Sequence, residues 1–259
     1  QPWVSLRELL LAWCLLTVSL SLMLRLLLFP ADVVTLDPNT AHSELVLSED
    51  LRRVKRGITW QNLPDTPERF KDLRCVLGRQ RFREGRHCWE VEVGEAVGGD
   101  SWWGVGVAKE SVERKGRVEM SMNSEKGIWA VWHRSGQFKA LTSPPTNLSV
   151  SPVPRRIWVC LDCTRGLVTF LNADTGVEIF TFPPASLHKE TLRPWFLVET
   201  RETQLCLRGS TLETLSPTSI LTSASSRPCP SPETSCSSPL DPAGDSPLCP
   251  VPAQGAEEE

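Results

Sequence analysis

Short runs in which apolar and polar residues alternate dominate the middle of the chain. Trp89, Val91 and Val93 alternate with Glu90 and Glu92, and this period of two is typical of a strand with one buried and one solvated face. Further runs of this kind are bounded by Gly, Pro, Asn and Asp, which favour turns. None of them has the 3.6-residue period of a long helix. The pattern predicts an all-β sandwich over residues 32–209 with little helix.

Turn residues separate several of the predicted strands. Asp162–Gly166 lies between the apolar runs 157–161 and 167–171, which predicts a hairpin with glycine at the turn. Asp174–Gly176 precedes another run, 178–182. These signals favour antiparallel neighbours.

The first 31 residues form a separate apolar segment. Nearly every residue from Leu9 to Phe29 is apolar, and a helix of that length, at about 1.5 Å per residue, spans a bilayer core. Residues 9–29 are therefore a candidate transmembrane helix, through which the chain would insert into a membrane. A translated intron end, a signal peptide and a buried helix are the alternatives that the sequence leaves open.

Residues 210–259 form a tail of different composition. It is rich in Pro, Ser and Thr and ends in three glutamates. Such a segment buries too little apolar surface to offset its chain entropy. We expect a disordered, acidic C-terminal tail.

Charge and cysteine spacing narrow the function classes. The formal net charge is −3, so no basic footprint favours nucleic-acid binding. The nine cysteines include one Cys-x-x-Cys pair, Cys160 and Cys163, but residues three apart on a strand point to opposite faces. We expect free thiols in a reducing compartment, and no metal site.

Catalytic residues do not converge in the sequence. His87 lies beside the Trp89 strand and is expected to pack or to cap a strand end, and His133 is expected to be exposed. A nucleophile elbow, a phosphate-binding loop and a dinucleotide fingerprint are missing from the sequence. The chain is predicted to be no enzyme and to need no cofactor.

A series of ordered motifs resembles the B30.2 (PRY-SPRY) domain of butyrophilins and tripartite-motif proteins. By this resemblance, residues 32–78 are the PRY segment and 79–209 the SPRY segment. Cys88, Trp158 and Cys163 depart from the residues usual in the family. The matching runs are Asp32–Pro38, Leu45–Asp50, Arg69–Phe70, Leu77–Gly78, Gly85–Gly94, Trp103–Val107, Arg114–Gly116, Gly127–Trp129, Leu161–Asp162 and Leu192–Phe196.

The resemblance implies a bent sandwich of two antiparallel sheets that binds a protein or peptide partner. It favours the intracellular domain of a butyrophilin-like membrane protein in immune regulation. The alternative is the substrate-recognition part of a tripartite-motif ubiquitin ligase whose catalytic modules lie outside this chain. A third hypothesis, a secreted domain, predicts a glycan on Asn147 of the sequon Asn147–Leu148–Ser149.

Strand alternation and the resemblance together select a candidate partner-binding surface. Ile128, Ala130 and Trp132 share one face of a strand and Trp129 the other. The resemblance implies that Trp132 is the surface candidate and Trp129 the core one. A core role for Trp132 and Trp195 is the alternative. A small phosphorylated ligand is not expected, because Gly104 supplies no cation where phosphate-reading relatives have one. The candidate residues are Trp132, Arg134, Trp195, Trp102 and Gly104, with Arg114 and Lys115 as possible cations.

Overall fold

The computed structural model describes residues 31–95, 101–115, 122–185 and 190–209. All of them lie in the first of two units of the chain, residues 1–216; the second is 217–259. The candidate transmembrane segment, 9–29, and the predicted disordered tail, 210–259, lie outside the described residues. Within the described residues, no helix is both long enough and apolar enough to cross a bilayer.

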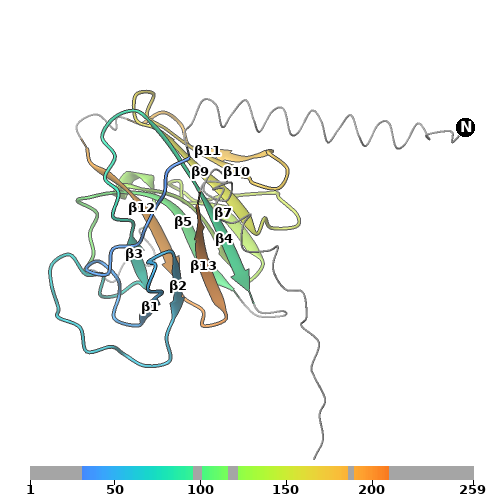
Figure 1. Ribbon diagram of the computed structural model, residues 1–259. Helices are drawn as coiled ribbons and strands as arrows, with labels where there is room; N and C mark the ends of the chain where they lie inside the picture. Colours follow the sequence, from blue (N-terminus) through green and yellow to red (C-terminus); the bar gives the residue numbers. More distant parts are fainter. Residues whose placement is uncertain (1–30, 96–100, 116–121, 186–189, 210–259) are drawn as a thin grey trace, which may run out of the picture. The chain divides into compact units, whose positions relative to one another are not determined.

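Two antiparallel sheets form stacked layers, which confirms the predicted sandwich (Figure 1). The seven-stranded sheet has the order β1-β2-β13-β4-β9-β10-β11, and the six-stranded sheet has the order β3-β12-β5-β6-β7-β8. The strands are β1 (Leu45–Leu47), β2 (Arg53–Arg56), β3 (Cys75–Leu77), β4 (Arg86–Glu95), β5 (Trp102–Lys109), β6 (Ile128–Arg134), β7 (Gln137–Ala140), β8 (Thr146–Asn147), β9 (Arg156–Asp162), β10 (Leu167–Asn172), β11 (Glu178–Thr181), β12 (Leu192–Val198) and β13 (Thr203–Arg208).

The alternating runs bury one face between the sheets, as their period predicts. Trp89, Val91 and Val93 of β4 are buried in the same apolar cluster as Trp103 and Val105 of β5. This cluster is the main core of the sandwich.

The predicted hairpin between residues 157–161 and 167–171 is confirmed. β9 pairs with β10 in antiparallel register from Ile157 opposite Asn172 to Asp162 opposite Leu167. Gly166 at the turn has a φ of +67°, a conformation that glycine adopts without the steric cost of a Cβ.

The expectation of free thiols is wrong for one pair of cysteines. Cys88 on β4 and Cys160 on β9 are register partners, and they form a disulfide with a Cα–Cα distance of 4.2 Å. Sequence spacing cannot find this pair, because the sheet register alone brings the two strands together. Cys163 points to the opposite face from Cys160, as predicted, and burial raises the pKa of its thiol to about 11.

His133 is buried, contrary to the expectation of exposure. Its Nδ1 lies 2.7 Å from the hydroxyl of Ser101, and its ring packs beside Trp103 at a centroid distance of 5.8 Å. His133 shares the core-facing side of β6 with Trp129 and Val131, which lie in the main core.

Candidate functional site

The outer face of the six-stranded sheet carries a second apolar cluster, separate from the core between the sheets. Its buried members include Ile128 and Ala130 of β6 and Trp195 of β12, and the half-buried Trp102 and Trp132 pack against it. Trp129 lies instead in the main core with 4% of its surface exposed. The alternation along β6 therefore sorts the two tryptophans as predicted.

Trp102, Trp132 and Arg134 form a layer on this face at the junction of β5 and β6. Arg134 is the register partner of Trp102, and Trp132 is the partner of Gly104. The guanidinium carbon of Arg134 lies 3.9 Å from the ring centre of Trp102. The rings of Trp102 and Trp132 are 6.2 Å apart, within the range of favourable aromatic contacts. We call these three residues the tryptophan–arginine platform.

The platform presents aromatic ring surface and a positive charge to a partner, and its indole N–H groups are turned away from solvent. The indole N–H groups of Trp102 and Trp132 are buried and have no hydrogen-bond partner among the described residues. The solvent-accessible parts of both side chains are therefore carbon edges and faces. Such a surface favours apolar and stacking contacts.

The end of β5 that holds Trp102 is fixed by the connection after β12. The Trp102 carbonyl accepts a hydrogen bond from the Glu199 N–H at 2.9 Å, and the Trp102 N–H donates to the Thr200 hydroxyl at 3.0 Å. Burial raises the pKa of Glu199, although Arg74 opposes this shift with an ion pair of 3.1 Å. The platform therefore rests on a well-connected part of the backbone.

The structure places Trp195 below this surface and not on it, so the expectation that its side chain is accessible is wrong. None of the Trp195 side chain is exposed, because the sheet covers one side and loops cover the other. A Cβ on Gly104 would lie 3.0 Å from Cζ3 of Trp195. Gly104 thus makes room for the indole and offers no contact of its own.

A small apolar cavity of about 70 Å³ lies beside Trp195. Trp195, Cys75 and Ile128 contribute to its lining, and burial raises the pKa of the Cys75 thiol well above its usual range. The cavity suits part of an apolar side chain, and the protonated thiol offers no nucleophile. Its lining residues are Phe70, Leu73, Cys75, Val112, Glu113, Arg114, Met122, Lys126, Ile128 and Trp195.

Arg114 and Lys115, predicted as possible cations for a partner, are engaged within the domain. Arg114 donates to the backbone carbonyls of Glu68 at 2.8 Å and Glu110 at 2.6 Å. Lys115 pairs with Asp65 at 2.7 Å. These contacts tie the loop after β5 to the segment before β3. Arg114 also lines the cavity beside Trp195, whereas Lys115 does not.

Groups of His, Cys, Asp and Glu with the geometry of a metal site do not occur among the described residues. The features that this face brings together are an aromatic layer, a stacked cation and a small apolar cavity. They can bind another molecule.

Comparisons with known proteins identify the family and the fold. The family model of the PRY, SPRY-associated domain matches residues 34–82, and that of the SPRY domain matches residues 86–210. E3 ubiquitin-protein ligase TRIM38 from Homo sapiens is 45% identical over 166 residues, covering 64% of this chain and 34% of that protein. Butyrophilin subfamily 2 member A2 from Mus musculus is 44% identical over 172 residues, covering 66% of this chain and 32% of that protein.

The solved structures include the crystal structure of the TRIM65 PSpry domain. It matches with a TM-score of 0.61 at 23% identity and covers 73% of this chain and 95% of that one. This likeness shows the fold. The chain spans only about a third of the length of TRIM38 and of the butyrophilin, at 34% and 32%.

Proposed function

Because the chain belongs to the PRY-SPRY (B30.2) family of butyrophilin and tripartite-motif proteins, we propose that it binds a partner protein on the outer face of its six-stranded sheet. A PRY-SPRY domain is a protein-interaction module, and catalysis is not expected of it. The observation that carries the proposal is the tryptophan–arginine platform. Trp and Arg are the residues most enriched at interface hot spots.

In the proposed mechanism, the partner lays an apolar segment over Trp102 and Trp132. A side chain of that segment enters the cavity beside Trp195. Arg134, held flat on Trp102, pairs with a carboxylate of the partner. Burial of ring surface supplies affinity, and the fixed cation supplies selectivity.

We propose that the chain is the intracellular domain of a butyrophilin-like membrane protein in immune regulation. The alternative is that it is the substrate-recognition part of a tripartite-motif ubiquitin ligase. The similar identities to TRIM38 and to the butyrophilin, 45% and 44%, support both. Sequencing of the full transcript separates them. An immunoglobulin-like ectodomain upstream supports the first, and a RING with a coiled coil supports the second.

The binding proposal is tested by affinity capture with the full chain, its Trp132→Ala variant and a matched Trp60→Ala variant. Trp60 is 60% exposed and belongs to the connection after β2. We expect a set of proteins that the wild-type chain and Trp60→Ala enrich and Trp132→Ala does not. Identical enrichment by both variants overturns the proposal.

A further inference from the structure

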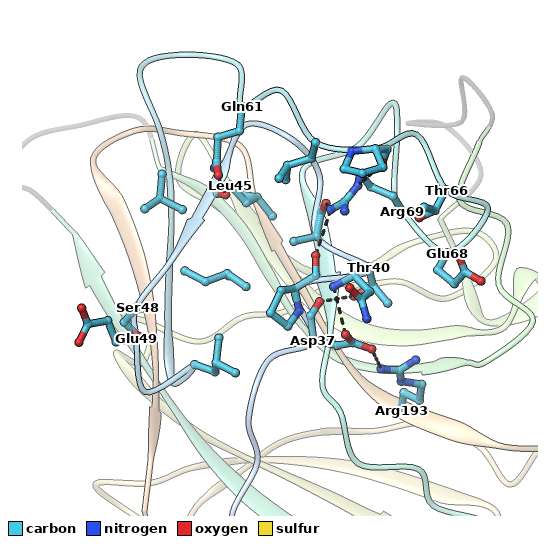
Figure 2. Close-up of a pocket in the computed structure, with 18 of the residues that line it drawn as sticks. Asp37, Thr40, Leu45, Ser48, Glu49, Gln61, Thr66, Glu68, Arg69 and Arg193 are labelled. Carbon is cyan, nitrogen blue, oxygen red and sulfur yellow. Dashed lines mark hydrogen bonds and ion pairs between the residues drawn. The ribbon is translucent and has the colours of Figure 1, made fainter.

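A large groove lies on a different part of the molecule, along the edge strand β1. It has a volume of about 800 Å³. Residues 45–49 form one wall, residues 61–69 the other, and residues 37–41 the floor. Figure 2 shows Ser48 and Glu49 on one side and Thr66, Glu68 and Arg69 on the other, with Asp37 and Thr40 between them.

One wall of the groove is a sheet edge with outward-facing backbone groups. β1 has a single neighbour, β2, and Val46 is the register partner of Lys55. Gly57 N–H donates to Glu44 C=O and Ser48 N–H donates to Arg53 C=O. Since antiparallel pairs alternate between bonded and non-bonded positions, the N–H and C=O groups of Leu45 and Leu47 point away from β2.

Only part of this edge is covered by the chain itself. The Gln61 side-chain amide donates to the Leu45 carbonyl at 2.6 Å, and the Leu45 N–H donates to the His42 carbonyl at 2.9 Å. For Leu47, no comparable contact to the opposite wall occurs in the described part of the chain. An uncovered edge is a template for another strand.

The groove also exposes apolar side chains. Val46 and Leu63 line it and are 40% and 37% exposed. Ile58 and Trp60, on the connection after β2, are also exposed, at 83% and 60%, but they do not line the groove. Exposed apolar side chains inside a groove favour its use as a docking site.

The cations of the groove are used within the domain. Arg193 pairs with Asp37 at 2.7 Å and with Glu110 at 3.0 Å. Arg81 pairs with the same Glu110 at 2.9 Å. Arg69 donates to three backbone carbonyls.

Two carboxylates of the groove are left for a ligand. Glu49 and Glu68 are exposed, line the groove, and form no ion pair with any described residue. They come from opposite walls, so a bound segment passes between them. The charge that the groove presents to a ligand is negative.

We propose that this groove is a second docking site, which binds an extended partner peptide carrying apolar side chains flanked by lysine or arginine. The peptide backbone pairs with Leu47 as an added strand. Its apolar side chains cover Val46 and Leu63, and its cations pair with Glu49 and Glu68. A second copy of the chain fits less well, because it brings the same two carboxylates to the interface. The site is independent of the tryptophan–arginine platform.

The test uses the full chain and a fluorescent peptide of alternating valine and threonine with lysine at both ends. A glutamate-ended peptide and a peptide N-methylated on its pairing edge serve as comparisons. We expect the lysine-ended peptide to bind about tenfold more tightly than the glutamate-ended one, and N-methylation to remove binding. Glu49→Lys with Glu68→Lys reverses the order of the two peptides, whereas the matched Glu84→Lys with Glu125→Lys does not.

A photo-crosslinker on the peptide locates the contact, which we expect within residues 45–49 and 61–69. Trp132→Ala is expected to leave this binding unchanged, so the experiment tests the groove independently of the proposed function. Equal affinity of the two charged peptides, absence of binding, or crosslinks on the platform overturns the proposal. Dimerisation of the chain through this edge, seen by sedimentation, also overturns it in favour of a second copy.

Discussion

Arg134 stacks on Trp102, with its guanidinium carbon 3.9 Å from the ring centre, because the two residues are register partners on β6 and β5. A guanidinium over an indole face is attracted by the ring quadrupole. The contact holds the cation flat against the sheet, where a partner meets charge and ring surface together.

Arg134→Ala is expected to weaken partner capture by about tenfold or more, the loss typical of a hot-spot arginine. Arg134→Lys restores the charge without the planar stacking group and is expected to recover only part of the affinity. The measurement is titration of the captured partner against each variant. Full recovery by lysine would show that charge alone matters and that the stacked geometry does not.

Trp195→Ala and Trp132→Ala are expected to differ in their effect on folding. Trp195 is fully buried, and truncation of a buried tryptophan lowers the free energy of unfolding by about 3–5 kcal/mol. Trp132 is half-buried, so its truncation is expected to cost less than half of that. Denaturant unfolding of both variants measures the difference. Equal losses would make Trp132 a core residue and remove it from the platform.

The two tryptophans also show what the sequence can predict. Alternation along one strand is a local property, and it correctly places Trp129 and Trp132 on opposite faces. The family resemblance indicated which of the two is the core residue. The prediction that Trp195 lies on the surface is wrong because every residue of β12 is buried. One face of this strand meets the other sheet, and loops cover the second face. Covering of this kind arises from segments far apart in the chain, and no period in the sequence carries it.

The same limit applies to charged loops. Arg114 is predicted as a possible cation for a partner, yet it reaches the Glu68 carbonyl 46 residues away. The groove along β1 depends on two walls and a floor from separate segments. Strand identities, hairpins and the fold class follow from local pattern and from the family motifs. Cavities and ion pairs require the tertiary arrangement.

His87 is held in a site that suits its protonated form. Burial lowers its pKa, but hydrogen bonds to the Asp32 carboxylate and the Glu84 carbonyl outweigh that effect, so the pKa is raised. Both ring nitrogens have acceptors, at 3.3 Å and 2.8 Å, and only the imidazolium donates from both.

His87→Gln is therefore expected to destabilise the domain more at pH 5.5 than at pH 8. A raised folded-state pKa adds stability that is fully present below the unfolded value, about 6.5, and is lost as the pH rises through the folded value. Unfolding free energies of wild type and variant across this range measure the effect. Asp32→Asn removes the main partner and is expected to flatten the same pH dependence. A difference between wild type and His87→Gln that stays constant with pH would contradict this assignment.

Reduction of the Cys88–Cys160 disulfide is expected to destabilise the domain. The bond closes a loop with a sequence separation of 72 residues, for which chain entropy gives about 4 kcal/mol. Unfolding with and without reductant measures the loss, and Cys88→Ser with Cys160→Ser is expected to reproduce it. Cys206→Ser, which changes a half-buried free thiol, is the control. Alkylation of Cys88 in the native, unreduced protein would show that the bond is absent.

The disulfide raises the question of which compartment holds the domain, because disulfides are uncommon in reducing compartments. The glycosylation state of Asn147 answers it. Asn147 and Ser149 of the sequon are exposed, and Asn147 lies on the short strand β8, so the surface is open to glycosylation. An intracellular domain is expected to leave this asparagine bare, since N-glycans are added to secreted chains. Gel mobility of the full chain from human cells, before and after peptide-N-glycosidase, measures this. A shift that disappears in Asn147→Gln would place the domain in the secretory lumen, where the disulfide is stable, and would overturn the intracellular proposal.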